Sequence, residues 1–360
     1  MGLLTLVLVK FLVLFLKAIV MTSTGGVDVL VEKDIDVPKV SSEDVLLKVV
    51  GCGICYRDTL ARRGFARLRL PVIPGHAIAG RVVEVGDGVL EEFKRNDLVV
   101  SLPYVYDPRD PRCVEGEENI CRSKMQIGEE RDGCYAEYIS LPYWVLVKVS
   151  DSGQVPEEAY SLASCPLGPP IRALKTIAKA QKGETVLVTG ASGGIGLHAV
   201  QIAKAYGLKV IATTRSEEKA EKIRRVSNPD HIIVHKGKFS EEVKKLTDGE
   251  GADYAIEAVG GPTLMETIRA LKWGGKVLLI GNIDPSPQQV MLGLIIIREN
   301  SIIGVLNCNK EELREAVELL RKGLVKPIYT TIPLDQDHVR KAHQTLEKGE
   351  SFGRIVIKPG

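Results

Sequence analysis

Residues 186–196 read Val186-Leu-Val-Thr-Gly190-Ala-Ser-Gly193-Gly194-Ile-Gly196, a glycine-rich stretch between an apolar run and the helical pattern of Ile195–Tyr206. Glycines allow the tight turn and close backbone approach that a pyrophosphate needs, and the amides at the helix N-terminus then hold its charge. The spacing is one residue longer than the plain G-x-G-x-x-G, so the position between strand and helix carries more weight than the string. An ordinary glycine-rich turn is the alternative. The stretch predicts a dinucleotide site that uses Gly190, Ser192, Gly193, Gly194, Ile195 and Gly196.

The chain around this loop alternates apolar β-like runs with helical patterns, which is typical of a doubly wound parallel sheet. Strands are expected at Glu184–Thr189, Lys209–Thr213, His231–Val234, Ala252–Ala258 and Lys276–Ile280. From Leu16 to about Leu146, short β-like runs between Gly and Pro predict a closed or nearly closed β-barrel instead. Its strands are expected at Val45–Val50, Arg81–Val85, Asp97–Leu102, Tyr135–Ile139 and Trp144–Val149. The tail from Lys310 predicts a helix and a last strand at Arg354–Lys358.

Composition narrows the class of protein. The chain has 360 residues, enough for two domains, and a net charge of +2, which argues against a nucleic-acid partner. Seven cysteines favour metal ligation or catalysis over a secreted disulfide framework. Met1 to Phe15 is almost wholly apolar but lacks the basic start and cleavage site of a signal peptide, and Lys17 interrupts it before it reaches membrane-spanning length. We expect an upstream extension on a cytoplasmic protein, with a membrane anchor as the alternative.

The end of the second parallel strand indicates which dinucleotide binds. An NAD site needs an acid about 20 residues after the glycines to bond the ribose 2′-hydroxyl, yet Leu197 to Ser216 contains no Asp or Glu. Thr214, Arg215 and Ser216 stand there instead, with Lys219 one helical turn further on. Hydroxyls and a guanidinium fork suit a 2′-phosphate, so the sequence favours NADP(H). The alternative is that Arg215 is only a solvated loop charge.

Several motifs in one order resemble the zinc-type alcohol dehydrogenase branch of the medium-chain dehydrogenase/reductase superfamily. They are Gly51-Cys-Gly-Ile-Cys55-Tyr-Arg-Asp58, Pro74-Gly-His76, the strand that starts at Asp97, Cys165 and the Gly190–Gly196 loop. Within the branch, Cys55-Tyr-Arg-Asp58 and Gly281-Asn282-Ile-Asp-Pro look similar to archaeal acryloyl-coenzyme A reductases. The resemblance implies an α/β fold in which a GroES-like β-barrel catalytic domain, residues 16–165 and 307–360, flanks a Rossmann domain, residues 166–306.

The resemblance also implies site residues. Cys55, His76 and Cys165 would hold a catalytic Zn²⁺, and two thiolates with one imidazole leave a position for water or a carbonyl oxygen. Buried structural thiols and a core histidine are the alternative. Asp58 matches the acid that orients this site in the family, and Gly281, Asn282 and Arg354 would join the cofactor site.

The sequence departs from the family at the residues that relay the alcohol proton. Arg57 and Leu60 stand where the relay groups are expected, and Ala77 replaces a Glu. Tyr56 is then the nearest phenol able to donate a proton, and Arg57 could stabilise an oxyanion or pair with an acid.

A second metal lobe is altered in the same way. Four positions that are Cys in the family read Asp107, Asp110, Cys113 and Cys121. A weakened zinc site, a Cys113–Cys121 disulfide and an empty lobe all remain open.

These observations favour a reductase of a small carbonyl or alcohol substrate, or of an enoyl-CoA whose phosphates would meet Arg62, Arg63, Arg67 and Arg69. A non-catalytic NADPH-binding protein is the hypothesis from another class. The family pairs Rossmann sheets edge to edge, and Gln289 to Val305 is rich in apolar β-formers. Leu292, Leu294, Ile295, Ile296 and Ile297 would leave an apolar edge on a monomer, so a homodimer or homotetramer is expected.

Overall fold

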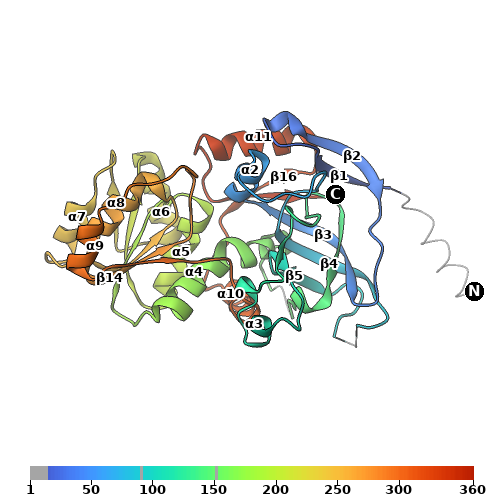
Figure 1. Cartoon of the computed structure of the whole chain (residues 1–360), viewed down its shortest axis with the longest axis horizontal. Helices are drawn as coiled ribbons and strands as arrows, with labels where there is room; N and C mark the ends of the chain where they lie inside the picture. Colours follow the sequence, from blue (N-terminus) through green and yellow to red (C-terminus); the bar gives the residue numbers. More distant parts are fainter. Residues whose placement is uncertain (1–14, 90–91, 151–152) are drawn as a thin grey trace, which may run out of the picture.

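The computed structural model describes residues 15–89, 92–150 and 153–360. They form a β-rich half and a half in which a parallel sheet lies between helices, seen at the right and left of Figure 1. The predicted α/β class, a GroES-like barrel joined to a Rossmann sheet, is confirmed. The domain boundaries at 165/166 and 306/307 stay predictions. Apart from Phe15, the predicted N-terminal extension lies outside the described residues.

The β-rich half is built on one mostly antiparallel sheet. Its strands run in the order β16-β17-β3-β4-β5-β9, and β8 pairs with β3. The C-terminal strand β17 lies against β3 through the pair Val356↔Gly53, so the tail returns to the first part of the chain. The bounds in this half are β1 Phe15–Met21, β2 Leu30–Asp36, β3 Asp44–Ile54, β4 Ala77–Val85, β5 Leu98–Ser101, β6 Tyr104–Val105, β7 Met125–Gln126, β8 Tyr138–Pro142, β9 Leu146–Lys148, β16 Tyr329–Pro333 and β17 Arg354–Lys358.

The parallel sheet has the order β12-β11-β10-β13-β14-β15. The strand order therefore reverses between β10 and β13, although all strands stay parallel. Ligands bind at such a switch point, outside the carboxyl ends of the strands. Successive residues of β10 show why both faces are covered: Val186 packs in one buried cluster with Leu197, whereas Leu187 packs in another with Leu264. The strands are β10 Thr185–Val188, β11 Lys209–Thr214, β12 His231–Val234, β13 Ala252–Glu257, β14 Leu271–Leu279 and β15 Ser301–Gly304.

Helices connect many of these strands. The α-helices are α2 Tyr56–Arg62, α3 Pro111–Val114, α4 Gly168–Ile171, α5 Gly194–Ala205, α6 Glu217–Ser227, α7 Ser240–Leu246, α8 Gly261–Ala270, α9 Leu292–Arg298, α10 Lys310–Arg321 and α11 Gln336–Glu347. Shorter 3-10 or π turns occupy Val27–Val29, Glu118–Ile120, Tyr143–Val145, Glu157–Leu162, Ala163–Leu167 and Arg172–Ala178. In the described parts of the chain, no helix combines the length and the apolar character that crossing a membrane requires.

Three local predictions were wrong. Residues 292–297, expected as apolar β-structure, form helix α9, which packs Leu294 and Ile295 against the sheet and exposes Ile296 and Ile297. The strand expected at Trp144–Val149 begins only at Leu146, because a 3-10 turn follows Pro142. The strand expected at Tyr135–Ile139 lies three residues later, at Tyr138–Pro142, where it pairs with β3.

Candidate active site

Two cysteines and a histidine meet beside the end of β3. Strands β3 and β4 pair through Gly53↔Ala77, so Cys55, just beyond β3, and His76, just before β4, are brought together. Cys165 arrives from the turn Ala163–Leu167, where its φ of −157° and ψ of 105° break the helical path before Pro166. The three side chains are buried, and their ligand atoms lie within 4.8 Å of one another. The structure therefore assembles the predicted metal ligands from three separate segments.

The charges around the cluster favour a thiolate. The Sγ atoms of Cys55 and Cys165 are 3.9 Å apart, and Arg354 donates to Cys165 Sγ at 3.3 Å. Contact with the Cys165 thiol, aided by the charges of Arg354 and His76, lowers the pKa of Cys55 well below its ordinary value, although burial opposes this shift. Thiolate sulfurs and an imidazole nitrogen at this spacing fit a zinc ion with one position left for another ligand.

Asp58 links the cluster to helix α2. Cys55 is the N-cap of this helix, and its backbone N–H donates to Asp58 Oδ2 at 2.7 Å. The other carboxylate oxygen lies 3.2 Å from His76 Nδ1, a charge contact whose N–H direction falls short of a well-aligned hydrogen bond. Burial lowers the pKa of His76, but Asp58 and the two cysteines outweigh it and raise this pKa well above its ordinary value. Asp58 thus contacts His76 on its Nδ1 side and leaves Nε2 for a metal.

A cavity of about 470 Å³ joins this cluster to the glycine-rich loop. Its lining includes Cys55 and Tyr56, the segment from Ser192 to Gly196, and Arg215 and His235. The positive φ of Gly190, 58°, provides the turn after β10. A Cβ at Gly196 would lie 2.3 Å from the carbonyl oxygen of Gly190, so only glycine fits where the helix approaches the turn. The predicted phosphate loop and the predicted metal ligands therefore share one cleft.

Comparisons with known proteins agree with this geometry. The profile described as "Alcohol dehydrogenase GroES-like domain" matches residues 41–151, and that described as "Zinc-binding dehydrogenase" matches residues 194–322. An acryloyl-coenzyme A reductase of Sulfurisphaera tokodaii is 37% identical over 325 residues, which cover 89% of this chain and 94% of the relative. The chain belongs to the zinc-type alcohol dehydrogenase branch of the medium-chain dehydrogenase/reductase superfamily.

The relatives include alcohol dehydrogenases as well as acryloyl-coenzyme A reductases. A NAD-dependent alcohol dehydrogenase of Sulfolobus acidocaldarius is 34% identical, with 91% of this chain and 95% of the relative covered. Among solved structures, AibC superposes with a TM-score of 0.88 at 35% identity, covering 96% of each chain. The likeness fixes the superfamily and an acryloyl-coenzyme A reductase-like subgroup.

The positions of the family's proton relay hold unrelated groups here. Arg57 forms a bidentate ion pair with Glu129 at 2.6 and 2.8 Å, and Leu60 and Ala77 are buried apolar residues. Tyr56 lines the cleft, and its hydroxyl donates to the carbonyl oxygen of Ile283 at 3.3 Å. Burial raises the pKa of Tyr56, so its proton is retained at neutral pH. Tyr56 is the predicted donor that the structure places at the cleft, whereas Arg57 already has an acidic partner.

Residues predicted for the adenosine end divide into two groups. Thr214 and Arg215 line the cleft. The Ser216 hydroxyl instead caps α6 by accepting from the Lys219 backbone N–H at 3.2 Å. The Lys219 ammonium donates to the carbonyl oxygens of Gly349 and Ser351, which ties α6 to the C-terminal tail. Neither Ser216 nor Lys219 lines the cavity.

The cleft also contains residues that sequence reasoning missed. His235 and Lys236 follow β12, and Lys348 comes from the end of α11 in the β-rich half. Of the remaining predicted residues, Arg354 lines the cleft and Gly281 and Asn282 do not. Only contacts between distant segments identify the new residues, because no motif in the sequence marks them.

Glu257 is a second missed feature. It is fully buried at the end of β13, and it accepts hydrogen bonds from the hydroxyls of Thr189, Thr263 and Thr267. The backbone N–H groups of Val259 and Gly260 also donate to it, at 2.9 and 3.0 Å. This carboxylate therefore ties the end of β10, just before the phosphate loop, to the loop after β13. The spacing of Thr263 and Thr267 on one helix face was the only signal in the sequence.

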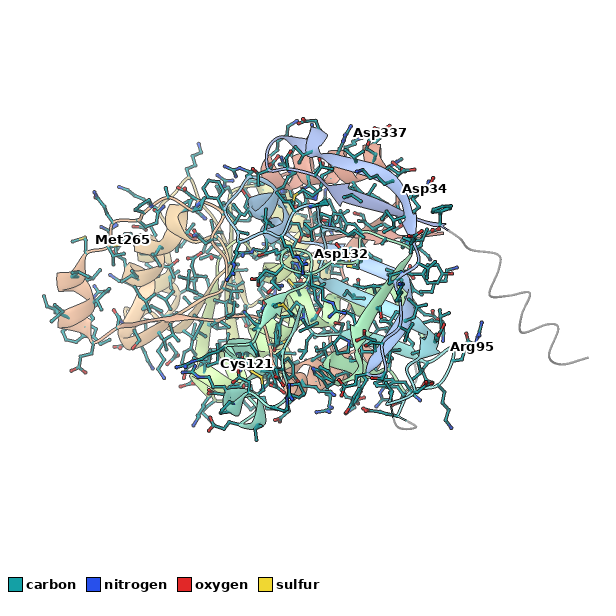
Figure 2. The ribbon with its side chains drawn as sticks, turned by 45° about the vertical axis from the view of Figure 1, so that its right-hand side comes forward. Asp34, Arg95, Cys121, Asp132, Met265 and Asp337 are labelled. Carbon is teal, nitrogen blue, oxygen red and sulfur yellow. A yellow bond between two sulfur atoms is a disulfide. The ribbon has the colours of Figure 1, made fainter. Side chains whose placement is uncertain are left out.

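Four cysteines outside the cluster pair in two disulfides, whereas the composition favoured metal ligation or catalysis. Cys52 and Cys134 form a disulfide that the sequence did not suggest, and Cys113 and Cys121 form another in the altered metal lobe, where Figure 2 labels Cys121. Asp110 lies within ligand distance of the latter pair, whereas Asp107 pairs with Arg109 at 2.9 Å. The structure shows the disulfide alternative in this lobe, but it also brings three of the four predicted ligands together, Asp110, Cys113 and Cys121, and leaves Asp107 apart.

Proposed function

We propose that the protein is an NADP(H)-dependent oxidoreductase that transfers a hydride between the nicotinamide and a small carbonyl or alcohol substrate. The single observation that carries this proposal is the cavity that Cys55 shares with the loop from Ser192 to Gly196. A nicotinamide whose pyrophosphate rests on that loop can reach the cluster, because both lie along one continuous cleft.

The residues of the cluster have distinct roles in this proposal. Cys55, His76 and Cys165 would hold Zn²⁺, which when bound supplies a Lewis acid that polarises a carbonyl oxygen. Asp58 contacts His76 Nδ1 at 3.2 Å and so favours the tautomer whose Nε2 is a ligand. Arg354 keeps a positive charge beside the Cys165 sulfur. Tyr56 holds a proton at the cleft for the developing alkoxide or enolate.

The preference for NADP(H) rests on Arg215. Arg215 lines the cleft, and the segment from Leu197 to Ser216 that contains β11 has no acidic residue. The guanidinium fork suits a 2′-phosphate. Lys236 and Lys348 also line the cleft and add positive charge to it.

A second candidate is reduction of an enoyl-CoA. Two relatives at 37% identity, from Sulfurisphaera tokodaii and Metallosphaera sedula, are named acryloyl-coenzyme A reductases. The absence of the hydroxyl relay, with Arg57 in its place, weighs against a plain alcohol dehydrogenase and favours this candidate. A non-catalytic NADPH-binding protein would not need Cys55, His76 and Cys165 together, so we regard it as the weaker alternative.

One set of measurements separates these functions. Purified protein is analysed for zinc, and NADPH oxidation is followed with ketones, aldehydes, enones and acryloyl-CoA. We expect bound zinc and turnover with one substrate class, and we expect His76→Ala to lose both. The matched control is His338→Ala, which removes a histidine on the surface of α11. A zinc-free protein that binds NADPH without turning over any of these substrates would support the non-catalytic alternative.

A further inference from the structure

A row of buried polar groups runs from behind the cluster of Cys55, His76 and Cys165 to helix α11. The Tyr135 hydroxyl lies 3.1 Å from Asp58 Oδ2 and 3.2 Å from His343 Nε2. Tyr135 and His343 are fully buried, and their rings meet edge to face with centroids 6.0 Å apart. Three polar side chains from three segments would be costly in a core unless they bonded one another, because an unpaired buried polar group costs about 1–3 kcal/mol.

The direction of the hydrogen bonds follows from the chemistry of the groups. An ionised carboxylate only accepts, so the Tyr135 proton points to Asp58. The tyrosine oxygen must then accept from His343, whose single ring proton sits on Nε2. His343 Nδ1 has no partner within the described residues, and burial lowers the pKa of this histidine to about 4, so the ring is neutral. The polarity therefore runs one way, from His343 through Tyr135 to Asp58.

At its other end, this row reaches His76. Asp58 Oδ1 lies 3.2 Å from His76 Nδ1, and Asp58 Oδ2 receives the N–H of Cys55 together with the tyrosine proton. The tyrosine hydroxyl thus fixes the rotation of the carboxylate that faces the imidazole.

We propose that Tyr135 and His343 are positioning residues that hold Asp58 against His76 and so set the affinity of the metal site. This inference rests on the proposed zinc site of Cys55, His76 and Cys165. Partners that orient a ligating histidine typically change metal affinity by about 10–100-fold when they are removed. The ordered set His343, Tyr135 and Asp58 extends that effect to α11, which lies on the outside of the β-rich half (Figure 1).

The test measures zinc affinity of the full chain by competition with a chelator. We expect Tyr135→Phe, which keeps the ring and removes the hydroxyl, to weaken zinc binding about tenfold. His343→Leu should weaken it in the same direction, whereas His343→Gln should restore affinity to within about threefold of the parent, since an amide N–H can occupy the place of Nε2. The cobalt-substituted proteins should show altered thiolate-to-metal absorption in Tyr135→Phe and not in His343→Gln.

Tyr104→Phe is the matched control. Its hydroxyl is equally buried and donates to the carbonyl oxygen of Cys308 at 2.7 Å, away from Asp58. We expect this variant to bind zinc as the parent does. If Tyr135→Phe and His343→Leu also bind as tightly as the parent, the positioning role is wrong while the zinc site stands. If the parent binds no zinc, or His76→Ala retains it, the proposed zinc site itself is overturned.

Discussion

Single side chains at the cleft determine which group can protonate the product of hydride transfer. Hydride transfer alone leaves an alkoxide or enolate, and the hydroxyl relay of the family is replaced by Arg57 and Leu60. Arg57 is held in its ion pair with Glu129, an arrangement that occupies its fork. Tyr56 lies at the cleft, and its hydroxyl donates one long hydrogen bond, 3.3 Å, to the carbonyl oxygen of Ile283. Its hydroxyl is therefore the group on which we test proton donation.

Replacing Tyr56 by Phe should lower turnover about 10²–10⁴-fold, the usual contribution of a general acid. Cofactor affinity should change little, because only an interaction of the transition state is removed. Steady-state kinetics with a parallel fluorescence titration of NADPH provide the measurement. Tyr329→Phe, whose hydroxyl contacts Glu158 in the β-rich half, is the control. A Tyr56 variant with more than half the parent turnover would remove this residue from the mechanism.

Arg215 is the residue that tests cofactor choice. We expect NADPH to bind at least tenfold more tightly than NADH, a difference of about 1.4 kcal/mol, because a guanidinium meets the 2′-phosphate. Arg215→Ala should reduce that ratio by weakening NADPH binding alone. Dissociation constants for both cofactors give the answer, and Arg225→Ala, on the exposed surface of α6, serves as control. Equal affinities of the parent for the two cofactors would contradict the assignment.

At the scale of elements, two carboxylates, the buried Glu257 and the half-buried Glu266, join helices and strands that are separated along the chain. Glu257 holds the ends of β10 and β13 together beneath the cofactor cleft. Glu266 on α8 similarly holds the start of α7 against α8. It accepts from the backbone N–H groups of Phe239 and Ser240 at the start of α7 and pairs with Arg269 at 2.9 Å. Each carboxylate satisfies donors that would otherwise lack partners at a chain turn.

Glu266 should make the stability of this helix pair depend on pH. Burial acts to raise its pKa, but the two amides and Arg269 outweigh burial and lower the pKa to about 2. A depressed folded-state pKa contributes stability above the ordinary value of about 4.5, and this contribution is lost as the pH falls towards about 2. Glu266→Gln should therefore reduce the free energy of unfolding at pH 7 by about 1–3 kcal/mol. The deficit should shrink progressively below pH 4.

Urea unfolding at several pH values between 7 and 3 measures this effect. Glu241→Gln on α7 is the control, since Glu241 is exposed and pairs with Lys244 at the surface. We expect it to change stability by less than about 0.5 kcal/mol at every pH. A Glu266 deficit that is the same at pH 7 and pH 3 would show that packing, and not charge, stabilises the α7 start.

At the scale of the whole molecule, the outer edge of the parallel sheet is unusually apolar. Strand β15 is the last strand of that sheet, and its neighbour α9 lies at the far end of the molecule from the barrel (Figure 1). Large apolar side chains there are exposed: Trp273, Leu292, Ile296, Ile297, Ile302 and Leu306. An edge with free backbone groups and such a surface favours pairing with another copy.

We expect a homodimer, or a homotetramer built from it, through this edge. Light scattering at micromolar concentration should give a mass of at least twice the chain. A charge in the edge, Ile302→Lys, combined with Ile297→Glu should shift the mass towards a monomer. Leu324→Lys, at an exposed apolar position after α10, is the control. A monodisperse monomer of the parent would contradict the expectation.

The sequence by itself determined the features that depend on local pattern. The strand–glycine–helix order of residues 184–206 and the alternation after it predict the parallel sheet, because strand and helix periods are properties of neighbouring residues. The same local reasoning failed where one pattern suits two structures, as in residues 292–297, whose apolar side chains fit a strand and a half-buried helix equally.

The tertiary structure alone decided what surrounds the reacting groups. Family motifs marked Cys55, His76 and Cys165, but nothing near them in sequence indicated that Tyr135 and His343 lie behind Asp58, or that Glu129 pairs with Arg57. The same holds for the Cys52–Cys134 disulfide, whose partners are 82 residues apart. The burial, hydrogen-bond partners and charged neighbours of a side chain depend on segments that the fold brings together. The sheet register that brings these segments together is set by packing of the core.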